Sequence, residues 1–554
     1  MLDGCTPWPE EFAERYRVAG HWRDETLGEL LGRLARTHSY KTALVAGTDR
    51  WSYAELDTRA DRLAAGLDWL GIGPGDRVVV QLPNTAELVA LLFALFRIGA
   101  QPVLALPAHR SSEITYFCEF TEAVAYVIPD VHMAFDYREL AADVAARVPT
   151  LKHVLVAGDP GGFTALGDVR GDPVDLPRPD PAEVALFLLS GGTTGVPKLV
   201  PRAHQEWSYS GRAVAEACDY GEETVHLVSL PLTHNWPLTH GLLATFHAGG
   251  TLVLAPGPSP DETFPIIERE RVTETGLIPG AALLWMEAAE WDEYDLSSLR
   301  RVTIGGTKLQ PELARRVEPA LGCRLQQAFG MAEGLCGFHR WDDPEDVVLV
   351  SQGLPVSPDD EVRVVDEDDH DVPPGEVGQL LARGPYTVRG YYRAPEHNDR
   401  TFTADGFYRT GDLVRLLPSG HIVFEGRVKD QINRGAEKIA AEEVENQLLA
   451  HPGIREVALV GLPDEVLGER ICACVVPRGT PPTLAELSLF LRGRGVAAFK
   501  FPDRLEIVHE LPLTPLGKVS KKTLTALLIS SGAPLSSSLI GSGAAAPSSF
   551  VKDA

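Results

Sequence analysis

Short runs of apolar, often β-branched residues alternate with amphipathic stretches along the first two thirds of the chain. Such runs occupy residues 78–80, 103–106, 184–189, 226–230, 251–254 and 301–304. Apolar runs of this length, bounded by turn residues and separated by helical patterns, are typical of strands in βαβ units. The pattern therefore predicts an α/β fold with layered and largely parallel sheets, whose ligands collect where the strands end.

The pattern changes further along the chain. Pro, Gly and Asp separate short alternating strands such as 361–365, which predicts a β-rich subdomain over about 351–429. Helices and strands alternate again over 430–528, with strands expected at 457–460, 471–476 and 505–508. We therefore expect a large N-terminal domain over 1–429 and a small α+β domain over 430–528. Residues 529–554 are rich in Ser, Ala and Gly, which predicts a disordered tail.

Composition narrows the classes of function. The 554 residues are 44% hydrophobic, which is enough to fill several globular cores. The 51 Lys and Arg residues stand against 77 Asp and Glu residues, a net charge of −26. This charge would repel nucleic acid or an anionic membrane over most of the surface, although a local pocket can still bind an anion.

The N-terminal residues and the cysteines indicate the compartment. The first residues have neither a basic start nor an apolar stretch, so no signal peptide is expected. The apolar run 88–96 ends at Arg97, far short of the ~20 residues that cross a bilayer. The seven cysteines include no C-x-x-C pair and are expected to be reduced and mostly buried. We predict a soluble cytoplasmic protein.

The most informative segment follows the predicted strand 184–189. It reads Ser190-Gly191-Gly192-Thr193-Thr194-Gly195-Val196-Pro197-Lys198. Small residues allow backbone N–H groups to converge on an anion, hydroxyls add donors, and Lys198 adds charge. The loop is not a Walker A motif, because the Lys does not directly follow the last Gly. It predicts a polyphosphate site; an ordinary glycine-rich turn is the alternative.

Four further motifs follow in order. They are Phe329-Gly330-Met331-Ala332-Glu333, Tyr408-Arg409-Thr410-Gly411-Asp412, Gly426-Arg427-Val428-Lys429-Asp430-Gln431-Ile432 and Thr514-Pro515-Leu516-Gly517-Lys518. With the phosphate loop, these motifs resemble those of the adenylate-forming superfamily of ATP-dependent acid ligases. The resemblance covers residues 8 to 525. Within the superfamily, segments 7–16, 106–110, 234–238, 326–334 and 358–362 are most similar to stand-alone aryl acid AMP ligases, such as 2,3-dihydroxybenzoate and salicylate AMP ligases of siderophore pathways.

The resemblance implies how ATP is held. Lys518 would bridge the acid and the α-phosphate, where positive charge accelerates the reaction most. Glu333 would bind Mg²⁺, Asp412 at the end of an expected turn would accept both ribose hydroxyls, and Arg427 would bind the ribose or the phosphates. The remaining implied ATP contacts are Ser190, Gly191, Gly192, Thr193, Thr194, Gly195, Lys198, Gly306, Ala328, Phe329 and Gly330. Local alternatives are a surface lysine at 518, a helix N-terminus at Glu333 and a salt-bridged hairpin for Asp412 and Arg427.

The resemblance also implies a second state. Asp430 matches the hinge about which the small domain rotates after adenylation, removing Lys518 from the site. Lys438 would then serve thioester formation. Ala436 stands where a second Gly is usual, a departure in that loop. No carrier domain is evident in the chain, so the thiol is expected from an aryl or peptidyl carrier protein in trans.

The acid pocket follows from the same resemblance. His234 would lie between carboxylate and phosphate, and Asn235 would donate to an ortho substituent of the ring, although an Asn in a turn before Pro also fits. The other implied contacts are Trp236, His240, Gly305, Ala332 and Cys336. His240 stands where dihydroxybenzoate enzymes commonly carry Ser; it either meets a ring nitrogen or meta hydroxyl or is a structural histidine facing solvent. The expected acids are of hydroxybenzoate, hydroxyanthranilate or hydroxypicolinate type.

Two other functions stay open at this point. One is an aryl-CoA ligase that uses free CoA, and the other is a non-catalytic nucleotide-binding scaffold. The presence of Lys198, Glu333, Asp412 and Lys518 argues against the scaffold. The prediction is therefore a ligase that uses ATP and Mg²⁺, acts on an aryl acid, and has neither nucleic acid nor membrane as a partner.

Overall fold

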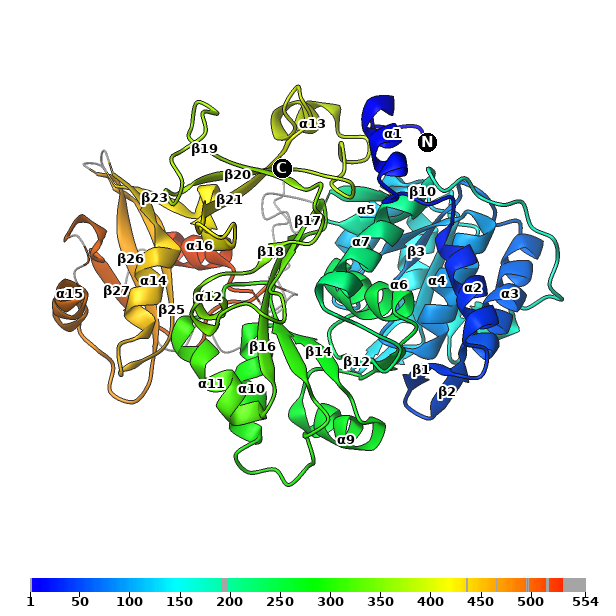
Figure 1. Cartoon of the computed structure of the whole chain (residues 1–554), viewed down its shortest axis with the longest axis horizontal. Coiled ribbons are helices and arrows are strands. Elements are labelled where there is room, and N and C mark those ends of the chain that lie inside the picture. Colours follow the sequence, from blue (N-terminus) through cyan, green and yellow to red (C-terminus); the bar gives the residue numbers. More distant parts are fainter. Residues whose placement is uncertain are drawn as a thin grey trace, which may run out of the picture. The chain divides into compact units, whose positions relative to one another are not determined.

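The computed structural model describes residues 2–190, 198–434, 437–464, 467–494, 496, 498–514 and 518–531. The chain forms two compact units. Unit 1 comprises Met1–Thr410 and Arg415–Phe424, and unit 2 comprises Gly411–Val414 and Glu425–Ala554. Helices and strands alternate in both units, which confirms the predicted α/β class (Figure 1).

The larger sheet of unit 1 has nine strands and carries most of the residues of interest. In spatial order they are β18 (Leu354–Pro355), β17 (Gly334–Phe338), β16 (Arg324–Met331), β15 (Arg301–Ile304), β14 (Glu274–Leu277), β12 (Val225–Val228), β13 (Thr251–Leu254), β1 (Thr42–Ala46) and β2 (Asp49–Ser52). The strands from β16 to β1 are parallel, whereas β17, β18 and β2 are antiparallel to their neighbours. The carboxyl ends of the parallel strands therefore share one edge, where ligands of such sheets bind.

A second sheet of unit 1 has seven strands. In order they are β11 (Leu199–Ala203), β10 (Val184–Leu189), β4 (Gln101–Leu104), β3 (Arg77–Val80), β5 (Ala125–Pro129), β8 (His153–Ala157) and β9 (Thr164–Ala165). Only the β10–β11 pair is antiparallel. Each strand predicted up to 304 is present to within two residues, because apolar runs of this length have few alternatives to a buried strand.

Helices cover both sheets. Those of unit 1 are α1 (Glu10–Val18), α2 (Leu27–Thr37), α3 (Tyr53–Trp69), α4 (Ala86–Ile98), α5 (Ser111–Phe120), α6 (Tyr137–Arg147), α7 (His204–Ala217), α8 (Ala244–His247), α9 (Pro260–Glu270), α10 (Pro279–Ala288), α11 (Pro311–Leu321), α12 (Glu345–Val350) and α13 (Pro395–Thr401). Thr26 and Ser52 cap α2 and α3 by accepting backbone N–H bonds. Helix α4 is apolar on all sides and packs beside α2 and α3 in a core shared by both sheets (Figure 1).

A four-stranded sheet leads from unit 1 into unit 2. Its strands are β19 (Glu361–Val365), β20 (Gly378–Arg383), β21 (Tyr408–Leu416) and β22 (Ile422–Arg427), and the last two belong in part to each unit. The motif from Tyr408 to Asp412 lies inside β21, so the turn expected there is wrong. Tyr408 is buried, and Gly411 has a φ of +71°, a local irregularity in the strand that glycine tolerates.

Unit 2 is a five-stranded sheet covered on both faces. Its strands are β24 (Glu437–Ala440), β23 (Gln431–Arg434), β26 (Gly468–Pro477), β25 (Ile454–Asp464) and β27 (Arg504–Ile507), and its helices are α14 (Ala441–Leu449), α15 (Leu484–Gly493) and α16 (Lys521–Ser531). Alternate residues of β25 face two cores. Leu459 packs with α14 and α15, whereas Ala458 and Val460 pack with Leu524 and Leu528 of α16.

Helix α16 changes the predicted tail. It ends at Ser531, so residues 529–531 are helical and not part of the tail. Burial of Leu524 and Leu528 explains this helix. Residues 532–554 lie outside the described residues. Among the helices that the structure describes, none combines the length and hydropathy needed to span a bilayer.

Candidate active site

The phosphate loop is closed at its base by a pair of hydrogen bonds. The N–H of Ser190 donates to the carbonyl of Lys198 at 2.9 Å, and the N–H of Lys198 donates to Ser190 Oγ at 3.1 Å. The antiparallel pair β10 and β11 brings these two residues together. Gly191, Gly192, Thr193, Thr194 and Gly195 lie outside the described residues. Ser190 is thus buried at the foot of the loop, and Lys198 lies beside it.

Glu333 lies in the turn of the hairpin formed by β16 and β17, not at a helix N-terminus as the local sequence also allowed. The Tyr391 hydroxyl donates to Glu333 Oε1 at 2.6 Å, and the Lys198 ammonium lies 5.7 Å from the centre of the Tyr391 ring. One phenol therefore contacts both the end of the phosphate loop and the candidate metal ligand. Burial and the neighbouring carboxylate raise the pKa of Tyr391, which keeps its hydroxyl a donor.

The acid-pocket residues follow strand β12. His234 ends the connecting turn, and its Nδ1 accepts from the N–H of Trp236 at 3.3 Å. Asn235 Nδ2 donates to the carbonyl of Met331 at 3.2 Å, while Asn235 Oδ1 accepts from Thr239 Oγ1 at 3.2 Å. The Asn235 amide thus joins this segment to the Glu333 hairpin and retains a second N–H.

A short π-helix, η2 (Pro237–Leu243), aims His240 into the sheet. Wide turns of this kind occur often at functional sites, because they re-aim a side chain within a helix. The His240 ring stacks on Trp236 and on Phe338, with ring centres 6.0 and 5.3 Å away, and its Nε2 hydrogen-bonds the Tyr220 hydroxyl at 2.8 Å. His240 is 2% exposed, so the solvent-facing alternative is wrong.

Strands β15 to β17 and the residues next to them carry the remaining residues that were predicted to contact the acid or the nucleotide. A Cβ on Gly305 would lie 2.9 Å from the carbonyl oxygen of Ala328 and 3.4 Å from Trp236, so only Gly allows this close approach. Gly306 follows with a φ of +83°. Gly330 pairs with Cys336 across β16 and β17, and Phe329 and Ala332 lie beside them in the same hairpin. Burial raises the pKa of Cys336 to about 12, so this thiol is a neutral wall group.

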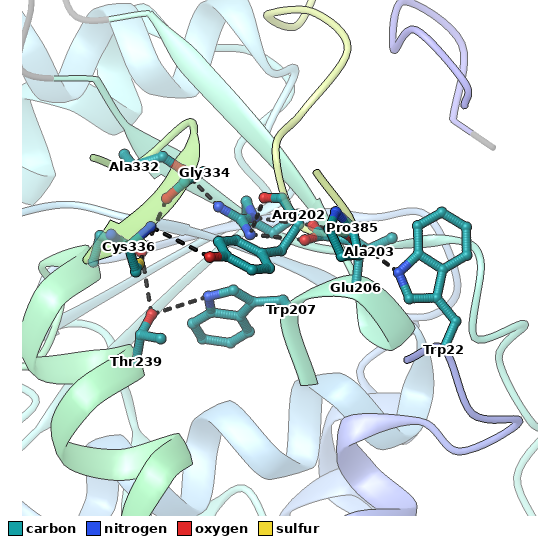
Figure 2. A network of polar contacts seen from close by, with 12 residues as sticks. Trp22, Arg202, Ala203, Glu206, Trp207, Thr239, Ala332, Gly334, Cys336 and Pro385 are labelled. Carbon is teal, nitrogen blue, oxygen red and sulfur yellow. Dashed lines mark hydrogen bonds and ion pairs between the residues drawn. The ribbon is translucent and has the colours of Figure 1, made fainter. Parts of the chain in front are cut away.

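A buried ion pair that the motifs did not indicate contacts the Glu333 hairpin. Figure 2 shows the Arg202 guanidinium beside the Glu206 carboxylate. Arg202 Nη2 lies 2.7 Å from Glu206 Oε2, and both side chains are almost fully buried. Arg202 also donates to the carbonyls of Ala332 at 2.7 Å and Tyr386 at 2.9 Å. The Tyr386 hydroxyl in turn accepts from the N–H of Cys336. Arg202 therefore holds the residue next to Glu333.

Unit 2 carries the other predicted ATP contacts. Arg427 Nε lies 2.9 Å from Asp412 Oδ1, as the salt-bridge alternative predicted, and Asp412 is buried. Thr514 N–H donates to the carbonyl of Lys518 at 2.6 Å, and residues 515–517, on which the predicted turn falls, lie outside the described residues. Asp430 ends a short 3₁₀ turn, Val428–Asp430. Lys438 pairs with Asn433 in the β23–β24 hairpin, and its side chain lies outside the described part of the chain.

Sequence alone did not indicate Tyr391, Tyr220, Arg202 or Glu206. Arg202 and Glu206, four positions apart next to the phosphate loop, were the only ones with a local signal. A cluster of His339, Asp343 and His421 was also unforeseen. His339 Nδ1 accepts from the N–H of Gln327 at 3.2 Å and its Nε2 pairs with Ser351 Oγ at 2.9 Å, so both ring nitrogens are engaged. His421 Nε2 lies 3.0 Å from Asp343 Oδ2, so hydrogen bonds and an ion pair hold the cluster in this structure.

Comparison with known proteins shows which family models and relatives this chain matches. Residues 31–392 match the family model "AMP-binding enzyme", and residues 443–518 match "AMP-binding enzyme C-terminal domain". The chain is 56% identical over 525 residues to 2,3-dihydroxybenzoate-AMP ligase of Bacillus subtilis (strain 168), covering 95% of this chain and 97% of that one. It is 48% identical to "Salicyl-AMP ligase / salicyl-S-ArCP synthetase" of Mycobacterium tuberculosis (strain ATCC 25618 / H37Rv), covering 95% of each.

A solved structure agrees with these relatives. The apo structure of MbtA from Mycobacterium smegmatis is 47% identical, with a TM-score of 0.75 over 94% of this chain and 98% of that one. The family models match most of both units, and the relatives align along nearly the whole chain. The chain therefore belongs to the AMP-binding enzyme family, the adenylate-forming superfamily that its five motifs resemble.

Proposed function

We propose that this enzyme activates an ortho-substituted aryl carboxylic acid with ATP, and then transfers the aryl group to the phosphopantetheine thiol of a carrier protein in trans. The observation that carries the proposal is the hydrogen bond from Asn235 to Met331, which joins the acid pocket to the Glu333 hairpin. The names of the relatives, a dihydroxybenzoate ligase and a salicyl ligase that also forms a carrier thioester, support the same reaction.

In the first step a carboxylate oxygen attacks the α-phosphorus of ATP. The bond from that phosphorus to the pyrophosphate oxygen breaks, and aryl-AMP forms. Lys518 would supply positive charge between the two anions, and the Ser190–Lys198 loop would hold the phosphates. Asp412 would accept from the ribose hydroxyls, and Arg427, which already pairs with Asp412, would bind the ribose or the phosphates.

The carboxylate of Glu333 is chemically suited to bind Mg²⁺. Its Oε1 already accepts from Tyr391, which orients the carboxylate, and carboxylate oxygens are ligands that this ion prefers. When bound, Mg²⁺ would neutralise phosphate charge. The remaining N–H of Asn235 would donate to an ortho oxygen of the acid. An acid without this substituent would leave a polar group unsatisfied, at a cost of about 1–3 kcal/mol.

In the second step the thiol sulfur attacks the acyl carbon. A C–S bond forms, the C–O bond to AMP breaks, and the thiol proton leaves to solvent or a base. We assign Lys438 to this state and Asp430 to the hinge that reaches it, since both lie in the first elements of the small domain.

Acid-dependent exchange of labelled pyrophosphate into ATP tests the first step. Salicylate should exceed benzoate in kcat/KM by at least about tenfold, because the Asn235 amide would be unpaired with benzoate. Asn235→Ala should bring the two acids within a few-fold of each other. Equal use of both acids by the unmodified protein would refute this role of Asn235. Failure of every aryl acid to support exchange would favour the non-catalytic scaffold.

The acceptor is tested separately. Purified protein that has formed aryl-AMP is offered either a phosphopantetheinylated carrier protein or free CoA, and thioester formation is followed by mass spectrometry. Transfer to the carrier at a much higher kcat/KM than to CoA is expected. Preference for CoA would replace the carrier reaction by the aryl-CoA ligase alternative.

A further inference from the structure

Two consecutive residues at the start of helix α7 lead to the hairpin of β16 and β17. Glu206 pairs with Arg202, which donates to the carbonyl of Ala332 in that hairpin. Trp207, the next residue, is fully buried, and Figure 2 shows its indole directed at Thr239. Trp207 Nε1 donates to Thr239 Oγ1 at 3.2 Å, so a second chain of hydrogen bonds begins at this helix.

The second chain runs through the acid pocket to the same hairpin. Thr239 Oγ1 donates to Asn235 Oδ1 at 3.2 Å, and Asn235 Nδ2 donates to the carbonyl of Met331 at 3.2 Å. Met331 directly precedes Ala332, so the two chains end on adjacent carbonyls. Trp207 and Thr239 are both buried, and in such surroundings an unmade hydrogen bond is costly.

The two ends of this chain fix the direction of every bond in it. An indole N–H can only donate, and a backbone carbonyl can only accept. Because the Thr239 hydroxyl accepts from Trp207, its single hydrogen is left to donate to Asn235 Oδ1. The Asn235 amide therefore keeps its oxygen toward Thr239 and its nitrogen toward Met331, with one N–H left for the acid.

Turning the Asn235 amide over would break both of its hydrogen bonds. Its oxygen would then face the Met331 carbonyl, and two acceptors cannot bond each other. Its nitrogen would face the Thr239 hydroxyl, whose hydrogen would lose its acceptor. The inverted amide would offer an acceptor to the acid in place of a donor. Its orientation thus decides whether an ortho oxygen that accepts or an ortho amino group that donates is favoured.

We propose that Trp207 and Thr239 are positioning residues for acid specificity: they hold the Asn235 amide with an N–H toward the ortho position of the ring. This inference rests on the proposed aryl acid activation. The hydroxyl oxygen of salicylate accepts from such an N–H. The amino nitrogen of anthranilate accepts poorly, because its lone pair is delocalised into the ring. Trp207 and Thr239 both act through Asn235 in this assignment.

The ratio of kcat/KM for salicylate to that for anthranilate, measured by pyrophosphate exchange, reports the orientation of the amide. Thr239→Val removes the hydroxyl and keeps the shape. It should lower this ratio at least about threefold, because inversion of the amide then breaks one bond fewer. Trp207→Phe should lower it at least about twofold, since the donor that fixes the Thr239 hydroxyl is lost. Thr239→Ser keeps the hydroxyl and should retain the ratio to within about twofold.

Two buried residues outside this chain serve as matched controls. Thr263 of α9 donates to the carbonyl four positions before it at 2.9 Å, and Trp285 of α10 donates to the carbonyl of Pro258 at 2.8 Å. Thr263→Val and Trp285→Phe should leave the ratio unchanged.

Three results would overturn the inference. They are a preference of the unmodified protein for anthranilate, an unchanged ratio in Thr239→Val or in Trp207→Phe, and an equal fall of the ratio in the control variants. Failure of every aryl acid to support exchange by the unmodified protein would instead refute the proposed function.

Discussion

Tyr391 joins two parts of the site that are distant in sequence. Its hydroxyl donates to Glu333, and its ring lies 5.7 Å from the Lys198 ammonium. The hydroxyl orients a carboxylate that would otherwise rotate, so its contribution is made through Glu333. At the scale of single residues, the site depends on such supporting contacts as much as on the motif residues themselves.

Replacing Tyr391 by Phe keeps the ring and removes the hydroxyl, which donates to Glu333 and also contacts the Tyr408 hydroxyl at 3.1 Å. We expect the Mg²⁺ concentration for half-maximal exchange to rise about tenfold, because outer-shell partners typically affect metal affinity to this extent. Titrating Mg²⁺ in the exchange assay measures the effect. Tyr392→Phe is the control, since Tyr392 is buried next to it in an apolar cluster. If Tyr391→Phe leaves the Mg²⁺ dependence unchanged, then either Glu333 does not bind the ion or Tyr391 does not orient Glu333.

Asp360 predicts a pH effect on stability. Burial raises the pKa of its carboxyl to about 7, although Tyr386 and the N–H of Ser357 donate to it. Its pKa in the unfolded chain is near 3.8. Between these values the unfolded state loses the proton first, so this group lowers stability progressively as pH rises from about 4 to about 7.

Asp360→Asn should remove that loss. The free energy of unfolding of the variant, relative to that of the unmodified protein, should therefore be higher at about pH 8 than at about pH 5 by on the order of 2 kcal/mol. Thermal unfolding at the two pH values measures the change. A variant whose relative stability is the same at both pH values would show that Asp360 ionises normally in the fold.

At the scale of elements, the hairpins of β16 to β18 determine where the site residues stand. Gly353 precedes β18 with a φ of +88°, and a Cβ there would lie 2.1 Å from the backbone of Phe338. No side chain can be accommodated against backbone at that distance. The packing of β17 on β18, next to Cys336 and Phe338, therefore requires Gly at this position.

Gly353→Ala should destabilise unit 1 by at least about 3 kcal/mol, since it combines backbone strain with a clash. Gly375→Ala separates the two causes. Gly375 has a φ of +87° and a Cβ there would meet nothing within 4 Å, so only strain of about 1–2 kcal/mol applies. Chemical denaturation compares the variants. Equal losses would mean that strain alone, without the clash, explains the requirement.

At the scale of the whole molecule, each unit has cores of its own. The clusters around Leu252 and Leu459 share no residue, and each contains only residues of one unit. Separate cores allow separate unfolding transitions, because cooperativity follows contiguous packing. The net charge of −26 is likewise a property of the whole chain, whereas the candidate anion site depends on a few local groups.

Core truncations test this independence. Leu459→Ala and Leu252→Ala each remove a fully buried side chain and should cost about 2–5 kcal/mol. In calorimetry of the full chain, Leu459→Ala should lower the transition of unit 2 alone, and Leu252→Ala that of unit 1 alone. A single transition that shifts equally with either variant would show that the units unfold together.

The α/β class, the strands with the strongest apolar runs and the family could all be predicted from the sequence. Strands such as β10, β13, β15 and β19 were predicted at their observed bounds, because a short apolar run between turn residues is a local signal. The motifs are equally local, and their order along the chain carries the resemblance. The hairpin position of Glu333 and the strand position of Asp412 were not predicted, since neighbouring strands decide both.

Which side chains meet follows from the tertiary structure. Tyr391 reaches Glu333 across 58 positions, and Arg202 reaches Ala332 across 130. Gly276, from strand β14, lies so close to Trp236 and His240 that a Cβ there would be 3.4 and 3.3 Å from them. Hydrogen bonds and close contacts of this kind depend on the register between strands, and no periodicity or motif within one segment records that register.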